Sequence, residues 1–262
     1  MNLLPFEKYQ ATGNDFIILD CMEANLINYH DTSLIQKMCD RRFGIGADGL
    51  LALLPIDDYD FKMLYYNSDG NPSTFCGNGS RCAVSYILDK IQKHSVRFKA
   101  SDGPHKAIRK NGLISVHMKD IQNYKETDQG FFVQTGSPHL IVEEENIEQL
   151  NVAVVGRKIR EEFSEEGANV NFIKYNNDVI NIRTYERGVE DETLSCGTGI
   201  TAAAYYVAIK EKKEGFPEFL VKSRGGNLTV NMKLTKSIAT EVHLIGPAVR
   251  VYSGFYELPK QS

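Results

Sequence analysis

The sequence has no long hydrophobic run, and this absence bears on where the protein works. The longest apolar stretches among its 262 residues, such as Leu50–Pro55, are far too short to cross a lipid bilayer. The opening segment MNLLPFEKYQ lacks the charged start and the extended apolar core of a secretory signal. We therefore expect a soluble cytoplasmic protein with no membrane partner.

Neither sign of charge dominates the chain. The formal net charge is −4, and the 30 basic residues are scattered rather than gathered. A nucleic-acid surface needs concentrated basic charge, so we expect no nucleic-acid partner. Hydrophobic residues make up 42 % of the chain, which is ordinary for globular proteins, and the length suffices for one large domain or two small ones.

Cysteines are few and are not arranged as a disulfide framework or a zinc site. Their odd number, their wide spacing and the missing export signal disfavour disulfides. No CxxC pair occurs, and no cluster of histidine and acidic residues or pyridoxal-type context is evident, so we expect neither a metal nor a cofactor. Some of the thiols should be small buried hydrophobes. The five are Cys21, Cys39, Cys76, Cys82 and Cys196.

An internal repeat is the most informative feature of the sequence. The stretch CGNGSRCAVSYIL from Cys76 returns as CGTGITAAAYYVA from Cys196, 120 residues later. TGNDFII from Thr12 returns as TGSPHLIV from Thr135, 123 residues later, and FGIGAD is loosely echoed by FSEEGAN. Matches in one order at nearly one offset predict two copies of one unit. Two copies are too few for a solenoid, so we expect a pseudo-symmetric pair of domains.

Each half is predicted to be rich in strands and to contain one long helix. Strand-forming runs cover 15–20, 50–55, 61–67 and 96–100, and Asn111-Gly112 is a strong hairpin signal. Hairpins are also predicted within 172–186 and 218–233. Helices are predicted over 33–43 and 153–163 and directly after each cysteine motif, where apolar residues recur at helical spacing.

Both cysteine motifs place a thiol directly before Gly-x-Gly and a helix. Glycines expose backbone N–H groups, and the first helical turn carries orphan donors and partial positive charge. These features bind a carboxylate and lower a thiol pKa from about 8.5. A single cysteine there would more often be a packed residue. The repetition favours two thiols that face each other across a cleft between the domains.

Two facing acid–base thiols suit the inversion of a stereocentre. One thiolate removes the α-proton from one face of the carbon, and the other thiol delivers a proton to the opposite face. Backbone N–H groups at the helix starts would hold the substrate carboxylate while the carbanion forms. This chemistry needs no metal and no pyridoxal cofactor.

The motifs closely resemble the diaminopimelate epimerase family over nearly the whole chain. The resemblance implies a cofactor-independent isomerase that interconverts LL- and meso-diaminopimelate in lysine and cell-wall biosynthesis. It implies a mixed α/β fold of two similar domains, each a β-barrel-like sheet around a central helix, with the active site between them. The domains would span 1–122 and 123–250, with the strand 251–262 returning to the first, in a homodimer. The motifs are TGNDFIILD, DRRFGIGADGLLAL, NSDGNPSTFCGNGSRC, TGSPH, GANVNF, YERGVEDETLSCGTG and GPAVRVYSGFYEL.

The same resemblance assigns roles to individual residues. It implies that Cys76 and Cys196 are the acid–base thiols, that His139 and Glu186 position or tune them, and that further residues bind substrate. Taken alone, this histidine and glutamate would suit a surface turn and a solvated charge, and an asparagine would suit a turn or cap. Arg187 would grip the distal carboxylate with its guanidinium fork. The other implied substrate-binding residues are Asn14, Asn67, Gly77, Asn78, Asn169, Gly197 and Thr198.

The chain departs from the family pattern at Ser137, where many members carry asparagine. The shorter side chain predicts that a contact to the distal end of the substrate is lost or passes through water. Asn171, two residues after Asn169, is the less expected substrate ligand. The nearest alternative is a proline or hydroxyproline racemase, whose first motif usually carries histidine where Asn78 stands. A non-enzymatic binding protein would not need two thiols, and a redox protein would need a closer pair.

Overall fold

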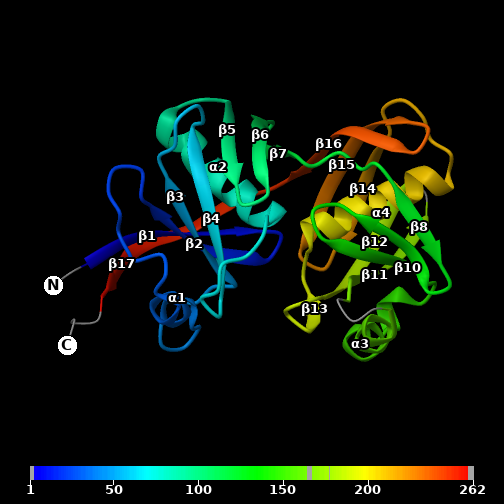
Figure 1. Cartoon of the computed structure of the whole chain (residues 1–262), viewed down its shortest axis with the longest axis horizontal. Coiled ribbons are helices and arrows are strands. Elements are labelled where there is room, and N and C mark those ends of the chain that lie inside the picture. Colours follow the sequence, from blue (N-terminus) through cyan, green and yellow to red (C-terminus); the bar gives the residue numbers. More distant parts are fainter. Residues whose placement is uncertain (1–2, 164–166, 177, 259–262) are drawn as a thin grey trace. The chain divides into compact units, whose positions relative to one another are not determined.

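The computed structural model describes residues 3–163, 167–176 and 178–258 (Figure 1). The chain forms two compact units. The first takes in the described residues up to Ile114 and from Pro247 on, and the second spans Ser115–Gly246. In this described part of the chain, no helix has both the length and the apolar character needed to cross a membrane. The predicted domain boundaries after 122 and 250 stay predictions, because compactness does not establish which segments fold independently.

The first unit is a sheet that curves around one buried helix. Its pairing order is β17–β1–β2–β3–β4–β5–β6, and α2 (Gly77–Ile91) contacts every one of these strands. α1 (Thr32–Cys39) packs on the other side of the sheet. The strands are β1 (Leu3–Ala11), β2 (Asn14–Asp20), β3 (Gly49–Leu54), β4 (Phe61–Asn67), β5 (Ser95–Ala100), β6 (Gly103–Lys110) and β17 (Val249–Glu257).

The second unit repeats this arrangement around α4 (Gly197–Lys210). The helix contacts β9 to β12 and β14 to β16, while α3 (Val152–Phe163) packs on the outer face of β11 and β12. β7 (Leu113–His117) leads into the unit, and η1 (Ile147–Gln149) is a single 3₁₀ turn. Its strands are β8 (Tyr124–Thr127), β9 (Gly130–Gln134), β10 (Pro138–Glu143), β11 (Asn169–Asn176), β12 (Val179–Glu186), β13 (Asp191–Thr193), β14 (Glu218–Ser223), β15 (Gly226–Thr235) and β16 (Ile238–Gly246).

Strand pairing confirms the internal repeat. From β1 to β6 the pairs alternate antiparallel, parallel, antiparallel, parallel, antiparallel, and the series from β9 through β12 and β14 to β15 alternates in the same way. In the first unit Phe16, Gly49 and Asn67 lie on three neighbouring strands. The corresponding residues of the second unit are, in the same order, His139, Asn169 and Glu186.

Burial on both faces explains why the central strands read as continuous apolar runs. In β2, Ile17 and Leu19 join the cluster around α1, whereas Phe16 lies close to Gly79 of α2. A sheet covered on both sides needs apolar residues at successive positions rather than at alternate ones. The expected fold class, two similar α/β units with a central helix in each, is confirmed.

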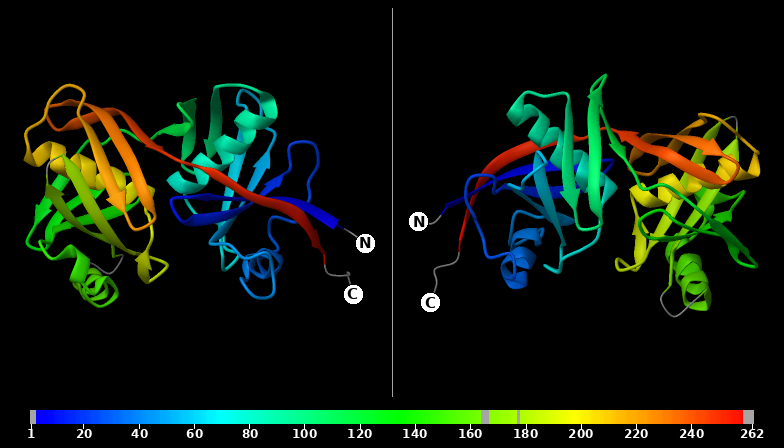
Figure 2. Two further views of the ribbon diagram at one scale, coloured as in Figure 1. Left: turned by 180° about the vertical axis from the view of Figure 1, so that it is seen from behind. Right: turned by 45° about the horizontal axis from the view of Figure 1, so that its top comes forward.

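Local signals decide where several elements begin and end. α1 stops at Cys39 instead of reaching residue 43, because the Asp40 carboxylate accepts hydrogen bonds from the backbone N–H groups of Arg42 and Phe43, each at 2.7 Å. Asn111 and Gly112 have φ angles of 52° and 76°, as a two-residue hairpin turn requires. Figure 2 shows β17 beside β1, the returning strand that the family resemblance implied.

Candidate active site

Cys76 caps the N-terminus of α2. Its backbone is extended, and its Sγ accepts a hydrogen bond from the N–H of Gly79 at 3.4 Å. The thiol therefore replaces the hydroxyl or carboxylate that usually caps a helix. In this position the sulfur lies at the positive end of the helix, where a thiolate is favoured.

Asn14 lies beside this thiol in a fixed orientation. Its Nδ2 donates to Asp48 Oδ2 at 2.8 Å, so its Oδ1 points the other way. That oxygen accepts from Asn78 Nδ2 at 3.2 Å and lies 3.9 Å from the sulfur of Cys76. We call Asn14, Cys76, Gly77 and Asn78 the first-unit cluster.

Paired charges hold the strand that carries Asn14. Asp15 lies between Lys8, whose Nζ is 2.7 Å from it, and Arg41, which binds both carboxylate oxygens at 2.7 and 3.0 Å. Burial alone would raise the pKa of Asp15, but the hydrogen bonds from Arg41 and Lys8 lower it to about 2. The carboxylate is thus ionised at neutral pH, and the pairs keep Asn14 beside the helix start.

Cys196 occupies the N-cap position of α4 with a similarly extended backbone, and its thiol lies next to a hydroxyl network. Its Sγ is 3.5 Å from Thr198 Oγ1, which is 2.9 Å from His139 Nε2. Ser137 Oγ closes a triangle, at 2.9 Å from the same ring nitrogen and 3.0 Å from Thr198 Oγ1. These four residues, with Asn171, form the second-unit cluster.

The hydrogen-bond pattern determines the tautomer of His139. Asn171 Nδ2 lies within 3.3 Å of two backbone carbonyl oxygens, those of Leu140 and Asn169, which can only accept. Asn171 Oδ1 accepts from Thr184 Oγ1 at 3.0 Å, which agrees with this orientation. The same Nδ2 is 3.0 Å from His139 Nδ1, so Nδ1 accepts and Nε2 carries the proton.

His139 is buried completely, with none of its surface exposed. Burial lowers the pKa of His139 to about 3, and the positive charge of Arg187 acts in the same direction. The ring is therefore a neutral donor through Nε2 at physiological pH. The reading of this residue as a surface histidine after a turn is wrong.

Gly199 permits this crowding at the helix start. A Cβ on Gly199 would lie 2.3 Å from Asn171 Oδ1 and 3.3 Å from His139 Cε1. In the first unit the equivalent Gly79 faces the side chains of Leu51 and Phe16 at 3.2 and 3.4 Å. The same helix–strand contact is therefore apolar in one unit and polar in the other.

Asn169, Glu186 and Arg187 lie at the strand ends near this cluster. Asn169 uses both ends of its amide within the protein: Nδ2 donates to the carbonyl of Pro138 at 3.0 Å, and Oδ1 accepts from the N–H of Arg187 at 2.9 Å. Glu186 Oε2 accepts from Thr193 Oγ1 at 2.8 Å. Arg187 is exposed.

The structure thus brings most of the expected residues into two groups, one in each unit. Asn67 belongs to neither group: it ends β4 as an exposed residue in register with Gly49. Sequence reasoning missed Arg81 and underrated Asn171. Both matter through burial and through the direction of their hydrogen bonds, which local sequence does not reveal.

The three further cysteines, Cys21, Cys39 and Cys82, are buried. Cys39 and Cys82 have exposures of 3 % and 0 %. Burial raises the pKa of Cys39 to about 12 and also raises that of Cys82. The thiols of Cys39 and Cys82 therefore stay protonated and serve as packing.

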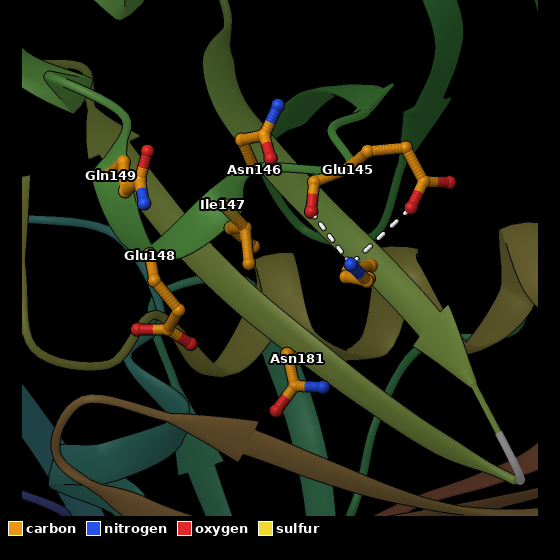
Figure 3. A pocket seen from close by; sticks show the side chains of 7 residues that line it. Glu145, Asn146, Ile147, Glu148, Gln149 and Asn181 are labelled. Carbon is orange, nitrogen blue, oxygen red and sulfur yellow. Dashed lines mark hydrogen bonds and ion pairs between the residues drawn. The ribbon is translucent and has the colours of Figure 1, made fainter.

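An open pocket on the second unit lies apart from the predicted site residues (Figure 3). Lys174 forms an ion pair with Glu145 at 3.3 Å there and donates to its carbonyl at 2.7 Å. None of the candidate residues lines this pocket. It is lined by Glu145, Asn146, Ile147, Glu148, Gln149, Lys174 and Asn181.

A family model and two related proteins that match nearly the whole chain all bear the same name. The family model described as diaminopimelate epimerase matches residues 6–121 and 131–251. A diaminopimelate epimerase of Flavobacterium psychrophilum is 46 % identical over 251 residues, which cover 94 % of this chain and 97 % of that protein. One of Aquifex aeolicus is 37 % identical, covering 96 % and 97 %.

Solved structures agree at the level of the fold. A protein of the phenazine biosynthesis PhzF family from Bacillus anthracis has a TM-score of 0.77 at 17 % identity, covering 98 % of this chain and 100 % of that one. A hydroxyproline epimerase from Agrobacterium vitis has a TM-score of 0.73 at 13 % identity, covering 97 % and 92 %. At these identities the likeness supports the shared two-unit architecture.

Proposed function

Because the chain belongs to the diaminopimelate epimerase family and is an isomerase, we propose that it interconverts LL- and meso-diaminopimelate through two thiols. The observation that carries the proposal is the repeated placement of a cysteine as the N-cap of a central helix, Cys76 in one unit and Cys196 in the other. Both thiols would act on one substrate molecule, from opposite faces of its α-carbon.

The proton balance of the proposed step is simple. A thiolate on one cysteine takes the α-proton and becomes a thiol, leaving a carbanion next to the carboxylate. The thiol on the other cysteine gives its proton to the opposite face and becomes a thiolate, so the configuration inverts. N–H groups of Gly77 and Asn78 and of Gly197 and Thr198 would stabilise the charge on the reacting carboxylate.

In this proposal His139 orders the second thiol and is not a base. Its Nε2–H can donate to Thr198, whose hydroxyl can in turn donate to the sulfur of Cys196, at the distances of 2.9 and 3.5 Å given above. A hydrogen bond donated to sulfur stabilises the thiolate. Glu186, held by Thr193, would act with it at the same strand end.

The distal end of the substrate also needs partners. Arg187 has an exposed guanidinium that can form a two-pronged contact with the distal carboxylate. Asn14, Asn67 and Asn169 are the proposed amide ligands. Ser137 is engaged with His139, Thr198 and Asn169, which supports an internal role in place of the substrate contact that asparagine makes in many relatives.

We also propose the wider setting that the family implies. A reaction that needs two reduced thiols suits the cytoplasm, and the product would serve lysine and cell-wall synthesis. A homodimer is supported by β17, which leaves Val251 and Phe255 54 % and 71 % exposed. Exposed apolar residues on a sheet are a common feature of subunit interfaces. No nucleic-acid or membrane partner is proposed.

Exchange of the α-proton tests the assignment. LL-diaminopimelate is incubated with the protein in heavy water, and deuterium at the α-carbon is followed by mass spectrometry together with the diastereomer ratio. The wild type should incorporate deuterium and form the meso isomer, whereas Cys76→Ala and Cys196→Ala should each lose epimerisation. Absence of exchange in the wild type would refute the function. Full epimerisation by either variant would refute the two-thiol mechanism.

A further inference from the structure

The helix that follows Cys76 contains a buried cation. Arg81 lies on the second turn of α2, and none of its surface is exposed. Moving a charged guanidinium out of water is unfavourable. A positive charge near a helix N-terminus is also repelled by the positive end of the helix dipole. Packing alone would be served better by an apolar residue, so some favourable interaction must offset these terms.

Neutral acceptors surround the guanidinium. It donates to Asn78 Oδ1 at 2.8 Å, to Thr12 Oγ1 at 3.2 Å, and to the carbonyl oxygens of Gly77 and Pro247, each at 3.3 Å. None of its partners within the described residues is a carboxylate. These four hydrogen bonds engage all three nitrogens of the guanidinium, but none of them supplies a counterion for its charge.

The acidic groups on and next to the elements that pack against α2 are bound by other cations, apart from Glu257, which is exposed at the end of β17. Asp15 and Asp48, the acidic groups closest to the first-unit cluster, are bound by Lys8 and Arg41. The remaining pairs are Lys90 with Asp20, Lys93 with Asp60, Arg109 with Asp89, Arg250 with Glu7, and His105 with Asp102.

The charge of Arg81 interacts with the thiols of Cys82 and Cys76. Burial raises the pKa of Cys82, so this thiol stays neutral. Burial lowers the pKa of Arg81 only to about 10, so the guanidinium stays charged at neutral pH. Cys76 is therefore the group that can supply the missing negative charge.

We propose that Arg81 is a positioning residue that stabilises the thiolate of Cys76. Of the two thiols near Arg81, those of Cys76 and Cys82, Cys76 is then the one that is ionised in the protein without substrate. The inference rests on the acid–base role given to Cys76 under the proposed function. A chain of contacts links Arg81 to this site: Arg81 donates to Asn78 Oδ1, and Asn78 Nδ2 donates to Asn14 Oδ1, which accepts from the thiol form of Cys76. The thiolate form accepts from the N–H of Gly79. The guanidinium thus fixes the surroundings of the thiol as well as favouring its charged form.

The second unit has no equivalent of this cation on its helix. Thr201 occupies the matching position, and its buried Oγ1 donates to the carbonyl of Gly197 at 3.0 Å. The repeat therefore conserves the cysteine and changes the residue behind it. A structural need of the helix start alone would not require arginine in one copy and threonine in the other.

The pH dependence of alkylation tests the proposal on Cys76 alone. In a Cys196→Ala background, the rate of Cys76 modification by iodoacetamide is measured between about pH 5 and pH 10, with peptide mapping to identify the product. We expect a midpoint near or below pH 7, against about 8.5 for an ordinary thiol. Arg81→Gln should raise the midpoint by at least about one unit, which slows modification at pH 6 about tenfold. Arg81→Lys should restore most of the shift.

A matched control and two decisive outcomes complete the experiment. Arg109→Gln makes the same change at a paired arginine near the far end of the helix and should leave the midpoint unchanged. A midpoint at or above about 8.5 with Arg81 intact would overturn the proposal without any arginine variant. So would an unchanged midpoint in a folded Arg81→Gln protein. If the midpoint is low and depends on Arg81 but the wild type exchanges no α-proton, the effect of Arg81 on Cys76 is upheld and the epimerase assignment is refuted.

Discussion

At single residues, the two units use one framework for different chemistry. Phe16 and Leu51 occupy the positions against Gly79 that His139 and Asn171 occupy against Gly199. The first unit thus has a buried polar side chain, that of Arg81, on its helix, whereas the second has His139 and Asn171 on its strands. Each arrangement places hydrogen-bond donors behind a cysteine, from opposite sides of the helix–strand contact.

Sequence could identify the two cysteines, because each lies in a repeated motif with glycines that mark a helix start. It could not rank Asn171 above Asn169 as a partner of His139. The two asparagines lie two residues apart on one strand, and their roles differ by which carbonyl oxygens they meet. The burial of Arg81 was equally hidden, since arginine inside an apolar helix more often reaches solvent.

Replacing Asn171 should disturb catalysis through His139. Asn171→Leu installs the residue found at the equivalent first-unit position and removes the donor to Nδ1. We expect a protein that folds, a mixture of ring tautomers, and a turnover rate lower by about tenfold or more. Ring ¹⁵N chemical shifts report the tautomer and an epimerisation assay reports the rate. If the variant kept a single Nε2–H tautomer, Asn171 would not be the residue that determines the tautomer of His139.

At the scale of elements, the alternating pattern of parallel and antiparallel pairs positions both helix starts. The central strands, the hairpins and the four α-helices of the described residues could be predicted, because apolar periodicity and turn residues are local signals. β1 was not predicted. It includes Pro5 and polar residues, and it pairs on one side with β2 and on the other with β17, which is more than 200 residues away. Such a long-range partner cannot be read from a local window.

The two helix-start glycines offer a matched pair of substitutions. Gly199→Ala would press its methyl group against Asn171 Oδ1, and this oxygen is held by Thr184. We expect a loss of about 1–3 kcal/mol in unfolding free energy together with reduced activity. Gly79→Ala meets only side-chain ends at 3.2 Å or more and should cost less, because alanine also favours the helix. Urea unfolding of both variants checks the order, which equal losses would contradict.

At the scale of the whole molecule, the buried histidine makes stability depend on pH. His139 has a folded pKa of about 3, whereas an unfolded histidine has about 6.5. Between these values the unfolded chain binds a proton that the folded chain does not. Stability therefore falls as pH falls through this window, by about 1.4 kcal/mol per pH unit from this group.

Urea unfolding of the wild type and of His139→Gln at pH 6, 5 and 4 measures this contribution. The variant lacks the titrating ring, so its unfolding free energy should fall with pH less steeply than that of the wild type, by about 1.4 kcal/mol per pH unit. Carboxylates such as Asp15 affect both proteins alike and cancel in the comparison. Parallel slopes would show that His139 accepts a proton while folded.

The return of β17 to β1 has a consequence for synthesis on the ribosome. The first unit begins at the start of the chain but lacks its last strand until residues 249–257 have been made. The second unit is one continuous segment, so all of its strands have been made once Gly246 has been added. The part translated first is therefore finished last, and until then β1 exposes an unpaired edge that a nascent-chain chaperone could cover.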